Sequence, residues 1–97
     1  MVNLPDRLSV PDDTEQTPAR EAASLAKAVC ERLKANRLER GLSIYRLSQL
    51  SGLNERAIDF IEKGERTPTI DTIARIALAM GVKVSEVINE AEKDCRP

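Results

Sequence analysis

The side chains with the most distinctive chemistry lie between residues 54 and 66, where basic and acidic residues are interspersed. Arg56 and Arg66 carry guanidinium groups, which can donate paired hydrogen bonds to phosphate oxygens or to O6 and N7 of guanine. Glu55 and Asp59 carry carboxylates, which can accept a hydrogen bond from the N4 amino group of cytosine. These residue types predict non-covalent recognition of a nucleic acid rather than catalysis.

The residues needed for a catalytic or metal centre are missing from the sequence. There is no histidine, which is the commonest metal ligand and the usual general base. Cys30 and Cys95 are far apart and form no CxxC pair, so we expect no zinc site. The sequence has no glycine-rich phosphate-binding motif and no nucleophile elbow. We therefore expect no enzymatic activity, no metal and no cofactor, with Cys30 buried and Cys95 exposed.

Helices must position the 54–66 segment, because apolar residues recur at spacings of three and four on both sides of it. Ser43 and Asn54 can cap the first turns of two helices, and Pro68 with Thr69 can open another. No run of alternating β-branched residues predicts a strand. The predicted helices span about residues 18–40, 44–50, 55–63, 68–80 and 84–91.

The fold predicted from this pattern is all-α: a compact five-helix domain over residues 21–91, preceded by a flexible arm. The arm, residues 1–20, is acidic and contains three prolines, and residues 92–97 form a polar tail. A chain of 97 residues can bury one modest core. The apolar positions expected to face that core are Ala22, Ala26, Val29 and Leu33, then Ile44, Leu47 and Leu50, then Ala57, Ile58 and Ile61, then Ile70, Ile73, Ile76, Ala77 and Met80, and finally Val84, Val87, Ile88 and Ala91.

The charge of the chain is unevenly distributed. The formal net charge is −1, which by itself does not favour binding to nucleic acid. Residues 1–20 contain four acidic and two basic residues, whereas residues 32–66 contain eight basic and five acidic residues. The central segment is therefore mildly basic, which permits DNA binding without establishing it.

Several short motifs, in order, resemble those of the lambda-repressor-like Cro/Xre helix-turn-helix family. They are RxxRGLS at residues 37–43, Leu47, Gly52-Leu53, IEKGERTP at residues 61–68, and the Gly81-Val82 break. The resemblance covers about residues 29–88, essentially the whole of that domain. It implies a five-helix DNA-binding domain of a transcriptional regulator, typically a repressor acting as a dimer.

The resemblance also assigns roles to individual residues. It implies that Arg37 and Glu62 form an ion pair that organises the domain, and that Gly52 occupies the turn between the second and third helices. It places base-reading residues at the start and exposed face of the third helix, at Asn54, Glu55, Arg56 and Asp59, with Phe60 nearby. Contacts to DNA phosphates are expected at Ser43, Arg46, Lys63, Arg66 and Thr67.

Some positions depart from the family pattern. Ile44 stands where the family often has a glutamine that supports both a phosphate and the reading helix, so one polar contact is lost. The acids Glu55 and Asp59 either accept from cytosine, or lie on a solvated face or pair with Arg56. Tyr45 is either a hydrogen-bond donor to phosphate or a surface packing residue.

Two functions remain open from the sequence. The first is a cytoplasmic, sequence-specific DNA-binding transcriptional regulator, a repressor, which binds double-stranded DNA as a homodimer and reads the major groove with residues 55–63. The second is a protein-interaction module, such as an antitoxin-like partner, that keeps the fold with weak or no DNA binding. The predicted last helix and the start of the first are candidate dimer surfaces, and the last helix or the N-terminal arm could hold a protein partner. No apolar run is long enough to predict a membrane span.

Overall fold

Five helices make up the part of the chain that the computed structural model describes, residues 17–95. They are α2 (Pro18–Glu39), α3 (Ile44–Ser51), α4 (Glu55–Glu62), α5 (Ile70–Ala79) and α6 (Val84–Cys95), and no strand occurs among these residues. The predicted all-α, five-helix fold is therefore confirmed. Most of the arm predicted at residues 1–20 lies outside the described residues, and its last residues, from Pro18 onward, belong to α2.

Side-chain oxygens cap the N-termini of four helices. The Thr17 hydroxyl accepts from the Arg20 N–H, and Ser43 and Asn54 accept from the N–H groups of Arg46 and Ala57. These bonds satisfy backbone donors that have no partner inside the helix, and the predicted caps at Ser43 and Asn54 are confirmed. At the fourth helix the predicted start at Pro68 is wrong. Thr69 is the cap there, with extended backbone angles (φ −77°, ψ 169°), so α5 begins at Ile70.

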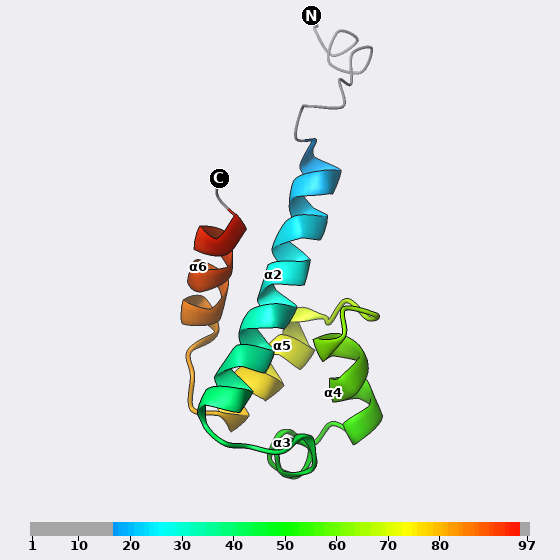
Figure 1. Ribbon diagram of the computed structural model, residues 1–97, viewed down its shortest axis with the longest axis vertical. Helices are drawn as coiled ribbons and strands as arrows, with labels where there is room; N and C mark the ends of the chain where they lie inside the picture. The colour runs from blue at the N-terminus through cyan, green and yellow to red at the C-terminus, as the bar shows by residue number, and fades with distance from the viewer. Residues whose placement is uncertain (1–16, 96–97) are drawn as a thin grey trace, which may run out of the picture.

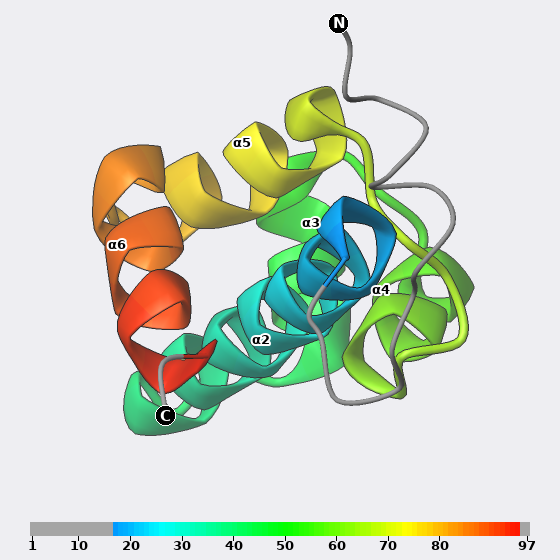
Figure 2. The same cartoon turned by 90° about the horizontal axis from the view of Figure 1, so that it is seen from above.

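The long helix α2 is central to the packing, with α6 along one side and α4 on the other (Figures 1 and 2). α3 packs against both α4 and α5, and α5 also contacts α6. Apolar residues on α2, α4, α5 and α6 form stripes that face the core. α3 adds one core residue, Leu47. The largest fully buried side chains are Leu33, Leu47, Ile58, Ile61, Ile76 and Val87. Cys30 is also buried, as predicted, and burial raises the pKa of its thiol.

Three apolar residues predicted to face the core are exposed. Leu50 is 45% exposed, because its neighbour Ser51 takes the buried position one turn after Leu47. Ile70 is 70% exposed, because it is the first residue of α5 and Ile73 is the first residue of that helix to reach the core. Ala22 is exposed because the first turns of α2 project beyond the other helices (Figure 1).

The prediction that the last helix ends at about Ala91 is wrong, since α6 continues to Cys95. Its final turn is tied to α2 by Arg32, which donates from Nε to Asp94 Oδ2 at 2.8 Å and from Nη2 to Asp94 Oδ1 at 3.1 Å. The same guanidinium lies 3.9 Å from a Glu90 oxygen. Apolar periodicity could not reveal this extension, because the contacts that hold the last turn are polar and connect residues far apart in sequence.

The Arg32–Asp94 pair leads to a prediction about pH. The hydrogen bonds from Arg32 lower the pKa of the Asp94 carboxyl from its ordinary value of 3.8. A lowered folded-state pKa means that the pair stabilises the last turn above pH 3.8, and that this stabilisation is lost as the pH falls through the lowered pKa. In an NMR titration the Asp94 side-chain carboxyl carbon should therefore show a midpoint below 3.8, together with loss of helical Cα shifts at residues 92–95. In Arg32→Gln the midpoint should return to the ordinary value; an unchanged midpoint would mean that Arg32 does not hold the turn in solution.

Candidate nucleic-acid interface

The position of α4 is set by an ion pair that is almost completely buried. Arg37 in α2 donates from Nε to Glu62 Oε2 at 2.6 Å and from Nη2 to Glu62 Oε1 at 2.8 Å, at the end of α4. Its third bond runs from Nη1 to the Leu42 carbonyl oxygen at 2.8 Å. The two side chains are 10% and 6% exposed, and the hydrogen bonds with Glu62 raise the pKa of Arg37. The pair implied by the family resemblance is thus present, and it joins two helices and a turn.

The turn between α3 and α4 depends on a residue with a positive φ. Gly52 has φ 79° and donates its N–H to the Ser48 carbonyl, closing the end of α3. A Cβ at this position would lie 3.5 Å from Arg75 Nη1, which is an ordinary contact. Glycine is therefore required by the left-handed backbone rather than by lack of space. After the turn, Asn54 caps α4 and directs the first turn of α4 outward.

The first turn of α4 presents Asn54, Glu55 and Arg56, all exposed, in a row. The Oδ1 atom of Asn54 is occupied, because it accepts from the Ala57 N–H at 2.8 Å. The amide nitrogen of Asn54 makes no hydrogen bond of its own in this cap and remains available as a donor to a base. Among residues 17–95, neither Glu55 nor Arg56 takes part in an ion pair.

Asp59 does not pair with Arg56, which was one of the possibilities that the sequence left open. Its Oδ2 atom instead lies 3.0 Å from Lys63 Nζ, one turn further along the same surface. The hydrogen bond with Asp59 is the main reason that the pKa of Lys63 is raised. Asp59, which was expected to read bases, and Lys63, which was expected to contact phosphate, are thus paired with each other in the free protein.

The other two basic side chains are held by an aromatic ring. The Arg56 guanidinium carbon lies 5.9 Å from the centre of the Phe60 ring, and that of Arg66 lies 5.5 Å from it. Both distances are within the range of a cation–π contact. The structure therefore brings Arg56 of α4 together with Arg66 of the following loop, which the sequence had assigned to separate roles.

A second polar group lies at the start of α3. Ser43 Oγ accepts from the Arg46 N–H at 2.9 Å, and the Arg46 side chain donates to Gln49 Oε1 at 3.3 Å. Gln49 Nε2 in turn donates to the Tyr45 hydroxyl at 3.0 Å. Tyr45 is 58% exposed, which is compatible with both roles suggested by the sequence, and its O–H remains able to donate to another acceptor.

Two contributors to this surface were missed by the sequence analysis. Gln49 was not considered, although it lies three residues after Arg46 and four after Tyr45, the spacings that bring side chains together on a helix. Phe60 was considered only as a DNA-facing position, and its contacts with two arginine side chains were not predicted. The exposed Thr67 makes no side-chain hydrogen bond within the described range.

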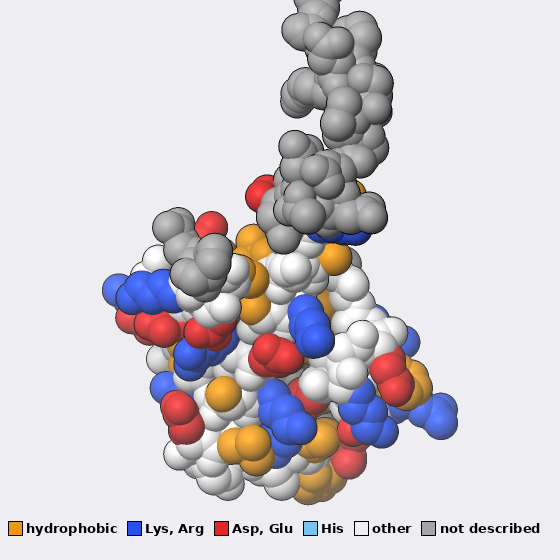
Figure 3. All heavy atoms as spheres, turned by 45° about the horizontal axis from the view of Figure 1, so that its top comes forward, with side chains coloured by type: hydrophobic (Ala, Val, Ile, Leu, Met, Phe, Trp, Pro, Cys, Tyr) orange, Lys and Arg blue, Asp and Glu red, His pale blue; other side chains and the backbone are white. Residues whose placement is uncertain are grey.

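On the face shown in Figure 3, acidic and basic side chains are interspersed rather than separated into a single basic field. Within residues 17–95 no group of three or more histidine, cysteine, aspartate or glutamate side chains could hold a metal ion. None of the helices described is both long and apolar enough to span a membrane.

Comparison with known proteins relates this chain to helix-turn-helix regulators. A family model described as helix-turn-helix matches residues 33–87. The HTH-type transcriptional regulator PuuR of Escherichia coli K12 is 37% identical over 67 residues, which are 69% of this chain and 36% of that protein. The immunity repressor protein of Bacillus phage phi105 is 32% identical over 62 residues, 64% of this chain and 43% of that one. The chain therefore spans less than half of the length of each of these relatives.

A solved structure shows the same fold. The restriction-modification controller protein C.AhdI of Aeromonas hydrophila superimposes with a TM-score of 0.61 at 32% identity. The match covers 67% of this chain and 97% of the controller protein.

The buried pair gives a prediction about stability. Glu62→Ala leaves the Arg37 charge buried without its carboxylate, which should lower the free energy of unfolding by about 3 kcal/mol. The matched control is Asp71→Ala, which removes an exposed pair with Arg75 on α5 and should change stability by less than about 1 kcal/mol. Urea unfolding followed by circular dichroism measures both. Equal effects of the two substitutions would contradict the role assigned to the Arg37–Glu62 pair.

Proposed function

Because this chain belongs to the helix-turn-helix family, we propose that it is a DNA-binding transcriptional regulator that represses its target genes as a homodimer in the cytoplasm. The observation that carries the proposal is the exposed guanidinium of Arg56, in the first turn of α4 and without a carboxylate partner among residues 17–95. An arginine at this point of a helix that enters the major groove can reach O6 and N7 of guanine together. No step of this role requires a catalytic residue or a cofactor.

The remaining residues of α4 have complementary roles in the proposed complex. The Asn54 amide nitrogen can donate to a base acceptor, while its oxygen stays in the helix cap. Glu55 can accept from the N4 amino group of a cytosine. Asp59 is engaged with Lys63, so it reads a base only if that pair opens when DNA binds. Arg56 is therefore the main base-reading residue in this proposal.

In the proposed complex, residues at the start of α3 and in the loop after α4 contact DNA phosphates. On one side are Ser43 and Arg46 at the start of α3, where the backbone N–H groups of a helix N-terminus favour an anion. On the other side are Lys63, Arg66 and Thr67 in the loop after α4, all exposed. Contacts of this kind fix the register of the protein on the duplex and carry no sequence information themselves.

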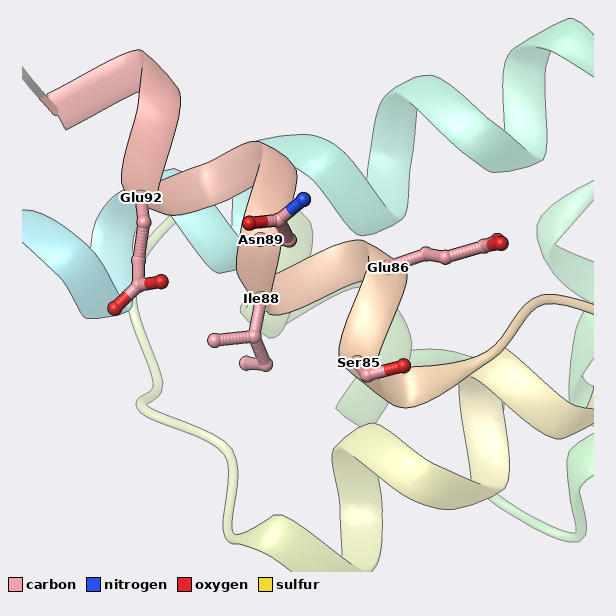
Figure 4. Close-up of a pocket in the computed structure, with 5 residues that line it drawn as sticks. All are labelled: Ser85, Glu86, Ile88, Asn89 and Glu92. Atoms are coloured by element: carbon pink, nitrogen blue, oxygen red, sulfur yellow. The ribbon is translucent and has the colours of Figure 1, made fainter.

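A second copy of the chain is needed for useful specificity, since one recognition helix reads only a few base pairs. Two half-sites about one helical turn apart, roughly 34 Å, would be read by a symmetric dimer. We place the dimer contact on α6, where a shallow groove of ≈ 540 Å³ is lined by Ser85, Glu86, Ile88, Asn89 and Glu92 (Figure 4). Ile88 and Glu92 extend from the same side of the helix in that view, which gives an apolar centre with a polar edge.

The decisive experiment is selection of bound sequences from random duplex DNA, followed by binding measurements on the selected site. Arg56→Ala should lose about 1–3 kcal/mol of binding free energy and relax selectivity at one guanine. Arg66→Ala should weaken binding to all sequences alike and reduce the salt dependence by about one phosphate contact. Lys93→Ala, on α6, which lies across α2 from α4 (Figure 1), is the charge-matched control and should change little.

The same measurements separate this proposal from the alternative. If the wild-type protein binds no duplex even at low salt, the DNA-binding role is excluded and the protein-interaction module is favoured. If it binds DNA but Arg56→Ala and Arg66→Ala bind equally well, the surface has been assigned wrongly.

The dimer contact has its own test. Ile88→Asp introduces a charge into the centre of the proposed interface and should shift the protein from dimer to monomer, measured by light scattering after gel filtration. Because Ile88 is partly buried against the core, circular dichroism must show that the variant keeps its helices. DNA affinity for a palindromic site should fall with it. Ser24→Asp, on the exposed first part of α2, is the control, because α2 is the other surface that the sequence suggested. Disruption by Ser24→Asp and not by Ile88→Asp would move the interface to α2.

A further inference from the structure

The Phe60 ring lies close to two cationic side chains that come from different structural elements. Arg56 is one turn before Phe60 on α4, whereas Arg66 is in the loop between α4 and α5. Their guanidinium carbons lie 5.9 and 5.5 Å from the same ring centre. A half-buried phenylalanine on an otherwise charged helix surface therefore has a specific set of partners.

The backbone after α4 is what brings Arg66 to the ring. Gly64 has φ 77° and donates its N–H to the Ile61 carbonyl at 3.0 Å, and Glu65 donates to the Phe60 carbonyl at 2.8 Å. These two bonds form a Schellman motif, which reverses the chain at the end of a helix. The reversal directs residue 66 back over Phe60, so the contact follows from the local fold rather than from a flexible side chain alone.

The two guanidinium groups have no competing carboxylate in the described part of the chain. Neither Arg56 nor Arg66 takes part in an ion pair there, although Glu55 and Glu65 are their sequence neighbours. Lys63, by contrast, is held by Asp59. Each guanidinium instead lies within cation–π range of the same electron-rich ring, which partly offsets the repulsion between two like charges near it.

We propose that Phe60 is a positioning residue that holds Arg56 and Arg66 as one unit, so that a guanine edge and a neighbouring backbone phosphate are bound together. This inference rests on the proposed DNA-binding function and adds to it a coupling between base reading and backbone contact. Ordering both side chains before binding removes part of the entropy that would otherwise be lost in the complex. At exposed sites each cation–π contact changes an equilibrium by about two- to fivefold.

The test is a double-mutant cycle on affinity for the selected duplex. Phe60→Leu keeps an apolar side chain and both positive charges but removes the ring, and it should weaken binding about fivefold. In an Arg66→Ala background the same substitution should weaken binding by about twofold or less, because one of the ring's two partners is then absent. Phe60→Tyr keeps the ring and should bind like the wild type.

The control cycle pairs Phe60→Leu with Arg46→Ala. Arg46 donates to Gln49 and makes no contact with the ring, so these two effects should be additive. Additivity in the Arg66 cycle as well would overturn the proposal, since Phe60 would then affect DNA binding through general stability or direct contact. Failure of Phe60→Tyr to restore affinity would overturn it too.

A measurement on the free protein separates this inference from the proposed function. In NMR spectra without DNA, ring currents should shift the side-chain protons of Arg56 and Arg66, and the Arg46 protons should show no such shift. Unshifted protons at both residues would show that the contacts are absent in solution, and this readout applies even if Phe60→Leu does not fold. Shifted protons in a protein that binds no duplex would instead mean that the ring contacts exist and the DNA-binding role is wrong.

Discussion

The opposite charges of Arg37 and Glu62 are buried together where α2, α4 and the α2–α3 turn meet. Burial of an ion pair is unfavourable unless the groups recover their hydrogen bonds, and Arg37 does so with both Glu62 oxygens and the Leu42 carbonyl. The buried aliphatic side chains of α4, such as Ile58 and Ile61, hold the helix against the core without strong directional preference. The paired hydrogen bonds add a directional constraint. The direction in which α4 presents its outer surface therefore depends on two residues that are not on that surface.

The outer surface itself shows how a chain with a net charge of −1 could bind a polyanion. Its basic groups differ in how they are engaged. Lys63 is neutralised by Asp59, Arg46 is oriented by Gln49, and Arg56 and Arg66 are held against an aromatic ring that carries no charge. Arg46, Arg56 and Arg66 therefore keep their positive charge in a defined place, Arg46 through a neutral amide and the other two through the ring. Local arrangement, rather than the total count of basic residues, thus determines the attraction that DNA would meet at this surface.

Sequence patterns predicted the helices because the periodicity of a helix and the chemistry of its caps are local. Leu47, Ile58, Asn54 and the pairing of Arg37 with Glu62 all followed from spacing or from the family resemblance. The errors arose where a tertiary contact decided the outcome: α6 extends to Cys95 through Arg32 and Asp94, and Ser51 rather than Leu50 faces the core. For the interface, the chain could suggest which residues carry suitable chemistry. It could not show that Asp59 pairs with Lys63 rather than with Arg56. It also could not show that a turn places Arg66 beside Phe60, because both contacts depend on side-chain geometry in three dimensions.

The separation of core-facing from accessible positions within α4 has a practical consequence for protein engineering. Three of its positions, Ile58, Ile61 and Glu62, face the core or form the ion pair, while the accessible or half-buried positions are Glu55, Arg56, Ala57, Asp59 and Phe60. The two sets alternate along one short helix, so the accessible set can be randomised while the scaffold is left intact. A combinatorial library at those positions would explore new target sequences without first having to rebuild a stable fold. The small size of the domain makes it a candidate module for synthetic gene circuits.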